Sequence, residues 1–319
     1  MSRISATLDR RTVNPALGVA MVLTAGAVFA LNGSVSKLML QGGLDAPRLT
    51  TFRATGAFLC LLVLATLIPP GPRRLALRRP ELPRLILFGL VGFFLVPMLY
   101  FVAISRLPVG VGLLFEFTGP VFVALWVRFG EHQRVKARLW LGLILTLTGL
   151  AAVAEVWAGE LRLDPLGIAA GLTSASLLAV FYVVGSKSVA SRDAISLTCW
   201  AFGVSAIAGA LVRPWWTFPA GVLAGSSGGI PMWLLALYLI LFGTLTPYLL
   251  VIASMRHLPP TSVGIIGTVE PVIASAFAWV FLSEILSAGQ IVGGLVVLVG
   301  VVLAETARAA KVEPEIPPA

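Results

Sequence analysis

Two glutamates lie near the middle of long apolar stretches, far from any predicted loop. Glu116 falls in the run Phe-Glu-Phe-Thr-Gly-Pro that ends at Pro120, and Glu270 directly precedes Pro271. A carboxylate at the centre of a bilayer costs about 3 kcal/mol on insertion scales, so each must face a cavity, find a partner or stay protonated. Both are therefore candidates for substrate binding or proton coupling. In the alternative interpretation, they bind carbonyl groups that the neighbouring prolines leave free.

Other side chains within the apolar stretches would complete a cavity around these carboxyl groups. Arg53 would either pair with an acid or a substrate carboxylate, or extend to the membrane interface. The candidates for neutral hydrogen-bonding groups are Asn32, Tyr100, Tyr182 and Tyr248. The candidates for apolar walls are Phe115, Phe117, Trp126 and Trp279.

Motifs of enzymes and metal sites give no competing interpretation. The two histidines, His132 and His257, lie in or beside loops, and no His-Glu-x-x-His, Walker or Cys-x-x-Cys pattern occurs. Cys60 and Cys199 fall in apolar stretches, where we expect them to pack in the core. The sequence predicts no enzyme, no metal and no cofactor. Any uphill transport would therefore be driven by an ion or substrate gradient or by a partner subunit.

The elements that position these residues are apolar almost throughout. Of 319 residues, 58% are hydrophobic and 12% charged, whereas a soluble domain carries about a quarter charged residues. The mean hydropathy is +0.97. Stretches of roughly 20 apolar residues cross a hydrocarbon core of about 30 Å. The sequence therefore predicts an all-α integral membrane protein with ten transmembrane helices, near 15–38, 47–69, 83–104, 107–128, 138–157, 165–187, 194–212, 231–255, 259–282 and 287–305.

The second half of the chain repeats the first. Leu107-Pro108, Pro120, Gly142 and Gly149 recur 151 residues later as Leu258-Pro259, Pro271, Gly293 and Gly300. Because each copy holds five spans, an odd number, the second copy enters the membrane from the opposite face, which is an inverted repeat. We expect a tail at 1–14, five-helix repeats at 15–157 and 164–306, and a second tail at 307–319.

The repeated prolines and glycines have separate expected roles. Helix bends are expected at Pro97, Pro120, Pro247 and Pro271. Gly142 and Gly149 are two helical turns apart, so they share a face, as do Gly293 and Gly300. We expect these faces to be helix-packing seams rather than ligand contacts, and they can pack within one chain or between chains of a homo-oligomer.

Basic residues give the expected orientation. The net charge is +9, and most of the 23 Lys and Arg residues fall in alternate loops and in both termini. By the positive-inside rule, this pattern predicts a multi-pass protein of the cytoplasmic (inner) membrane with both termini in the cytoplasm. The basic character then reflects topology and not nucleic-acid binding.

Several motifs resemble the EamA family of the drug/metabolite transporter superfamily, whose members have ten spans in two five-span repeats. The residues that show the resemblance are Arg53, Arg106-Leu107-Pro108, Arg256-His257-Leu258-Pro259, Glu270-Pro271 and Leu282-Ser283-Glu284, with Ser283 in place of the usual glycine. The run Phe115 to Pro120 is similar to the Leu-Glu-Phe-Ile-Gly-Pro run of threonine/homoserine exporters. Glu131 departs from the pattern, because it follows Pro120 by 11 residues whereas Glu284 follows Pro271 by 13.

The resemblance implies a secondary active transporter that exports amino acids or related small metabolites by alternating access through a central cavity. The expected partners are a small-molecule substrate, the lipid bilayer and protons, unless substrate exchange drives transport. An importer of sugars or nucleotide-linked metabolites is the nearer alternative, since direction and substrate separate it from an exporter. A membrane receptor or scaffold without transport is a further alternative, although such a protein has no need of two equivalent halves.

Overall fold

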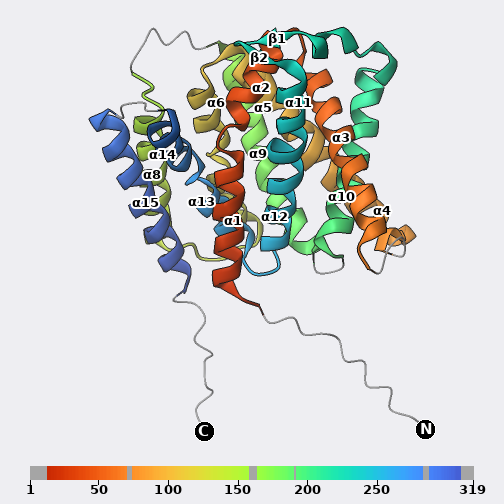
Figure 1. Cartoon of the computed structure of the whole chain (residues 1–319). Helices are drawn as coiled ribbons and strands as arrows, with labels where there is room; N and C mark the ends of the chain where they lie inside the picture. The colour runs from red at the N-terminus through yellow and green to blue at the C-terminus, as the bar shows by residue number, and fades with distance from the viewer. Residues whose placement is uncertain (1–12, 70–73, 158–163, 190–191, 283–286, 310–319) are drawn as a thin grey trace, which may run out of the picture.

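Helices form most of the part of the chain that the structure describes (Figure 1). The structure, a computed structural model, describes residues 13–69, 74–157, 164–189, 192–282 and 287–309. The α-helices and strands, in chain order, are α1 (Pro15–Phe29), α2 (Asn32–Gln41), α3 (Ala46–Leu67), α4 (Leu82–Phe88), α5 (Val96–Arg106), α6 (Val109–Glu116), α7 (Gly119–Leu125), α8 (Ala137–Val153), α9 (Pro165–Ser188), α10 (Ala194–Val212), β1 (Ser226–Ser227), β2 (Ile230–Pro231), α11 (Met232–Ile240), α12 (Thr246–Ser254), α13 (Pro260–Gly267), α14 (Glu270–Leu282) and α15 (Ala288–Ala309).

The described residues confirm the predicted all-α membrane protein. Eight helical stretches are long and apolar enough to cross a bilayer, and α8 is a shorter apolar helix. The predicted span 259–282 is divided into α13 and α14. The Ser283-Glu284 part of the family-like motif and most of the two tails lie outside the described residues.

Two repeat-related spans are broken into separate helices beside Pro120 and Pro271, where the sequence predicts bends. The break between α6 and α7 falls at Phe117 and Thr118, and that between α13 and α14 at Thr268 and Val269. Pro120 and Pro271 each lie in the first turn of the following helix. The hydroxyl groups of the two threonines donate to main-chain carbonyls three residues earlier, at Phe115 and Ile265. Each broken end therefore finds hydrogen-bond partners within its own span, as lipid requires.

The third and eighth spans share a different irregularity. A π-helical segment, Gly89–Leu95, precedes α5, and another, Leu241–Leu245, precedes α12. Pro97 and Pro247 lie in the first turn of the helix that follows each segment. Proline lacks the N–H of a regular helical bond, and the wider π turn shifts the hydrogen bonds before it.

The fifth spans of the two repeats, α8 and α15, pack against each other along most of their length. A β-carbon built on Gly142 would lie 2.7 Å from the carbonyl oxygen of Gly300, and one on Gly149 would lie 2.6 Å from that of Gly293. The early glycine of one helix thus meets the late glycine of the other, so α8 and α15 are antiparallel. This is the relation that an inverted repeat produces.

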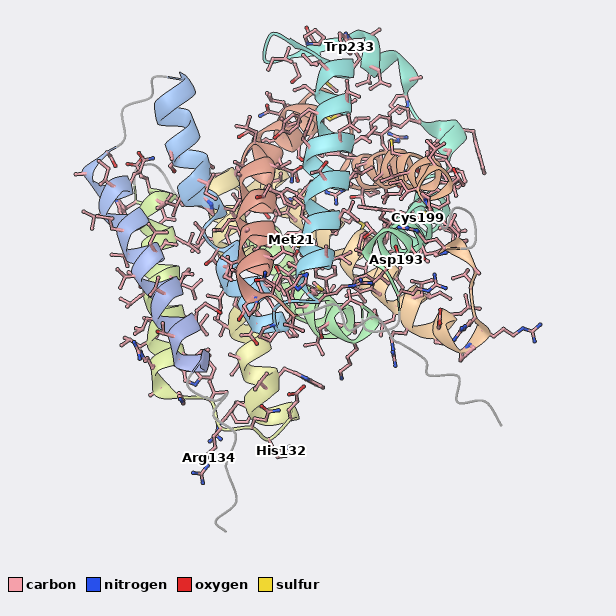
Figure 2. All side chains as sticks on the ribbon, turned by 60° about the horizontal axis from the view of Figure 1, so that its bottom comes forward. Met21, His132, Arg134, Asp193, Cys199 and Trp233 are labelled. Atoms are coloured by element: carbon pink, nitrogen blue, oxygen red, sulfur yellow. The ribbon has the colours of Figure 1, made fainter. Side chains whose placement is uncertain are left out.

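Ion pairs lie at both ends of α10, one to the start of α3 and one to Arg74 in the segment that follows α3. Asp45 caps α3 and lies 3.5 Å from Arg213, and Asp193 caps α10 and lies 3.1 Å from Arg74. The Asp193 end is on the terminus face, the side of the bundle where α1 begins and α15 ends; the Asp45 end is on the far face, which carries β1 and β2 (Figure 1). His132 and Arg134 project from the terminus face, and Trp233 lies at the opposite side (Figure 2).

The glycine seam gives a first test. Replacing Gly149 with valine places side-chain atoms against the backbone of α15, which should lower the free energy of unfolding by about 1–3 kcal/mol. The thermal unfolding midpoint of the purified protein in detergent measures this. Gly221→Val is the control, since a β-carbon there has no neighbour within 4 Å. Equal midpoints for wild type and Gly149→Val would contradict the close packing.

The cap of α9 gives a pH-dependent test. The Gly167 N–H donates to Asp164 over 2.9 Å, and with Arg106 Nη1 at 3.2 Å it lowers the pKa of the Asp164 carboxyl below its ordinary value. A lowered pKa contributes stability above the unfolded value of about 3.9, and that stability is lost as pH falls through the folded pKa. Asp164→Asn keeps a capping oxygen without the charge. Its unfolding midpoint should be below wild type at pH 7, and the gap should close below about pH 3.9; a gap that persists in acid would show that charge is not the cause.

Candidate functional site

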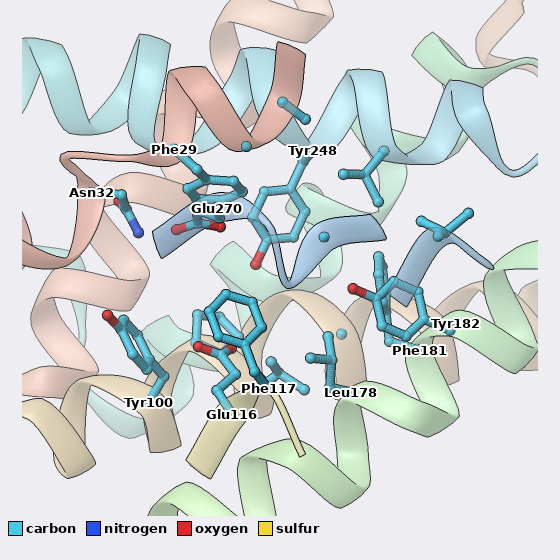
Figure 3. Close-up of a pocket in the computed structure, with 18 of the residues that line it drawn as sticks. Phe29, Asn32, Tyr100, Glu116, Phe117, Leu178, Phe181, Tyr182, Tyr248 and Glu270 are labelled. Carbon is cyan, nitrogen blue, oxygen red and sulfur yellow. The ribbon is translucent and has the colours of Figure 1, made fainter. Parts of the chain in front are cut away.

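The two intramembrane carboxyl groups stand on either side of the repeat-related breaks. Glu116 is the last residue of α6, and Glu270 is the first residue of α14. Their side chains face each other across one space (Figure 3). Gly26 of α1 allows α14 to approach, since a β-carbon built there would lie 3.6 Å from the β-carbon of Glu270.

The repeat offset of 151 residues does not superpose the two glutamates. Residue 116 corresponds to Gly267, and residue 270 corresponds to Gly119. Each half thus supplies one carboxyl group, from opposite sides of its break. The two carboxyl groups are therefore placed asymmetrically, although the two halves that carry them are related by the repeat.

A central cavity of about 120 Å³ connects these groups. Helices of both halves contribute to its walls. It is lined by Val22, Ala25, Gly26, Phe29, Asn32, Arg53, Gly92, Val96, Pro97, Tyr100, Leu113, Glu116, Phe117, Leu178, Phe181, Tyr182, Tyr248, Val251, Val263, Gly267 and Glu270.

Arg53 is the cationic group of the cavity lining. Its side chain is only 1% exposed, so it is buried and does not extend to the membrane interface. The guanidinium carbon lies 5.5 Å from the ring centre of Phe101 and 5.2 Å from that of Tyr248, which are cation–π distances. Among the described residues, its Nε and Nη2 atoms have no hydrogen-bond partner. Such buried donors favour an anionic group at the site.

Neutral polar groups lie beside the carboxyl groups. Asn32 and Tyr100 are both buried, and within the described chain the Asn32 Oδ1 and the Tyr100 hydroxyl lack a hydrogen-bond partner. Glycines make room for both: a β-carbon on Gly243 would lie 2.5 Å from Asn32 Oδ1, and one on Gly33 would lie 2.8 Å from the Tyr100 hydroxyl.

An aromatic cluster lies on the terminus-face side of the cavity. It contains Phe88, Phe93, Phe181, Phe202 and Tyr248, whose contacting ring centres are 4.6–6.4 Å apart. Phe181 and Tyr248 line the cavity, while α4 and α10, which carry Phe88 and Phe202, begin at the terminus face. The cluster therefore joins the cavity wall to the helices that begin at that face.

The structure brings together most of the residues singled out in the sequence. Glu116, Glu270, Arg53, Asn32, Tyr100, Tyr182 and Tyr248 all line the cavity, as does Pro97. Phe115 does not, because its β-carbon packs against Gly171 of α9. Pro120 packs near Gly264, and Pro271 lines a neighbouring cavity.

Phe117, expected as an apolar wall, does line the cavity. Trp126 does not, because its side chain is exposed, and the side chain of Trp279 lies outside the described residues. Sequence reasoning missed Phe29, Leu178 and Phe181 as cavity walls. These three are ordinary apolar residues of a membrane helix, and no sequence signal separates a cavity wall from a lipid contact there. The expectation for Cys60 was wrong: Cys199 is buried, but Cys60 is exposed on α3.

Comparisons with known proteins cover almost the whole chain. The EamA-like transporter family matches residues 16–154 and 165–306. An uncharacterized transporter of Archaeoglobus fulgidus is 28% identical over 287 residues, which are 89% of this chain and 94% of that protein. The threonine/homoserine exporter RhtA of Escherichia coli is 26% identical over 275 residues, 86% of each chain. A crystal structure with 18% identity covers 93% of this chain and 100% of its own, with a TM-score of 0.73, and shows the shared fold.

The contrast between Phe115 and Phe117 gives a test of the cavity. In a chain with Cys60 and Cys199 replaced by alanine, Phe117→Cys should react with a small charged methanethiosulfonate reagent. Phe115→Cys, two residues away, should react at least about tenfold more slowly, because lipid and α9 exclude a charged reagent. Mass spectrometry of the intact protein measures both rates, and the parent without cysteine is the control. Equal rates would contradict this placement of the two side chains.

Proposed function

Because the chain belongs to the EamA-like transporter family, we propose that it is a secondary active exporter of amino acids or related small metabolites. The membrane-spanning helices and the central cavity support the transport of a small molecule across the bilayer. Both glutamates face the cavity, which favours this over a purely structural role as carbonyl caps.

The observation that carries the proposal is the placement of three charged side chains in one membrane cavity. Glu116 and Glu270 supply carboxyl groups from the two halves, and Arg53 supplies a guanidinium. An amino acid presents the complementary pair, an ammonium and a carboxylate. The ammonium would bind a glutamate, and the carboxylate would bind Arg53, as guanidinium groups do. Asn32 would help orient the substrate.

The two carboxyl groups also suggest how transport is driven. Two carboxylates facing one cavity attract a cation between them, and either a proton or the substrate ammonium supplies it. In the proposed cycle, one glutamate is protonated when the cavity is empty and ionised when substrate is bound. An inward proton movement would then accompany each outward substrate, unless a second substrate makes the return step.

The distribution of basic residues supports an orientation in the cytoplasmic membrane. Arg74, Arg192 and Arg256 join one hydrogen-bonded group at the terminus face: Arg74 bonds Asp193, Arg192 bonds Glu81, and Arg256 bonds the Arg192 carbonyl. With the positive-inside rule, the terminus face is the cytoplasmic face.

Proteoliposomes test the proposal. Vesicles loaded with labelled amino acids should release them faster when protein is present and an opposing proton gradient is imposed. Glu116→Gln and Glu270→Gln remove one ionisable group each without changing shape, and each should lower gradient-driven release at least about tenfold, the effect of 1.4 kcal/mol or more on the rate-limiting step.

Glu131→Gln is the matched control, because Glu131 is exposed in a loop outside the cavity. It should release substrate as the wild type does. If both cavity variants keep wild-type release and the same response to the gradient, the carboxyl groups do not couple transport. If wild-type protein releases no amino acid, the chain is not an amino-acid exporter.

A further inference from the structure

The central cavity has a polar and an apolar half. Asn32, Tyr100, Glu116 and Glu270 gather on one side, and Leu178, Phe181 and Tyr182 lie on the other (Figure 3). Phe29, Phe117 and Tyr248 lie between them. A bound molecule that fills this space therefore meets charges at one end and hydrocarbon at the other.

One face of α9 makes the apolar half. Leu178, Phe181 and Tyr182 are spaced by three and four residues, so they point the same way from the helix. Val251 of α12 and Val263 of α13 also line the cavity with apolar groups. The Tyr182 hydroxyl is a polar group in this half, and its ring adds to the apolar wall.

Glycines of three neighbouring elements leave room for these α9 side chains, so the side chains lie away from the cavity centre. A β-carbon built on Gly92 would lie 2.3 Å from the Phe181 ring, and one on Gly264 would lie 3.2 Å from the Tyr182 ring. A β-carbon on Gly119 would lie 3.2 Å from Leu178 Cδ2. Each side chain thus packs over a glycine. Larger residues at those positions would push the apolar wall into the space that a ligand needs.

We propose that the preferred substrates are amino acids with large apolar side chains, such as leucine, methionine and phenylalanine, rather than small hydroxylated ones such as threonine or homoserine. This inference rests on the proposed function. The charged α-amino and α-carboxyl groups bind in the polar half, and the side chain enters the apolar half. Transfer of a hydrocarbon side chain from water to this half lowers the free energy of binding. A hydroxyl group loses its hydrogen bonds to water there and finds few hydrogen-bond partners in the protein.

A release assay with a panel of labelled amino acids tests the inference. At equal internal concentrations, proteoliposomes should release leucine and phenylalanine at least about tenfold faster than threonine and homoserine, since one methylene in an apolar pocket already changes specificity by roughly 10-fold or more. Threonine release as fast as leucine release would overturn the inference and leave the proposed function standing. No release of any amino acid would overturn both.

Substitutions at Leu178 test the placement of the side-chain subsite. Leu178→Trp should fill the apolar half and lower phenylalanine and leucine release at least about tenfold relative to alanine release. Leu172→Trp is the matched control, because Leu172 lies on the same helix and is 39% exposed. It should keep the wild-type order of substrates.

Leu178→Ala provides a second, milder change if the tryptophan variant fails to fold. It enlarges the apolar half, so phenylalanine release should rise relative to leucine release. The amount of folded protein after reconstitution and the ratio between substrates are measured together, so loss of protein is not mistaken for loss of selectivity. An unchanged leucine-to-phenylalanine ratio in every folded Leu178 variant would overturn the placement of the subsite on α9.

Discussion

The need to satisfy every backbone polar group within the bilayer shapes this protein more than any other constraint. Water does not reach the lipid-facing backbone, so a helix can break only where protein groups replace its hydrogen bonds. At both breaks a threonine hydroxyl, from Thr118 or Thr268, bonds a nearby carbonyl. The breaks then place Glu116 at the end of one short helix and Glu270 at the start of another. The positions of both carboxyl groups therefore depend on the helix breaks and on the hydrogen bonds that stabilise them.

The sequence predicts the large-scale organisation well because that organisation depends on one-dimensional properties. Apolar length predicts the membrane helices, and the repeated prolines and glycines predict two related halves. The ionisable residues are also recognisable, since Glu116, Glu270 and Arg53 are out of place among apolar neighbours. The direction of an apolar side chain is not recognisable in this way. Phe115 and Phe117 have the same chemistry, yet Phe117 lines the cavity and Phe115 packs against Gly171 of α9.

The two faces of the bundle are held together to different extents. On the terminus face, Arg74 and Arg192 are mostly buried, with side-chain exposures of 12% and 10%, and each pairs with an acid across the two halves. On the far face, Arg213 is 50% exposed and lies 3.5 Å from Asp45. Exposed pairs contribute little to stability and are screened by salt. The two halves are therefore joined more firmly at the terminus face.

The glutamates break the symmetry that the glycine seam keeps. At the seam, Gly142 contacts Gly300 and Gly149 contacts Gly293, an arrangement that exchanging the two halves leaves unchanged. The position equivalent to Glu116, however, holds Gly267, and the position equivalent to Glu270 holds Gly119. A homodimer of identical five-helix subunits would have to carry a carboxyl group at both equivalent positions or at neither, because two-fold symmetry copies every residue. Fusing the halves into one polypeptide removes that restriction. A single chain can therefore build a cavity with distinct ends, in which a substrate binds in one orientation only.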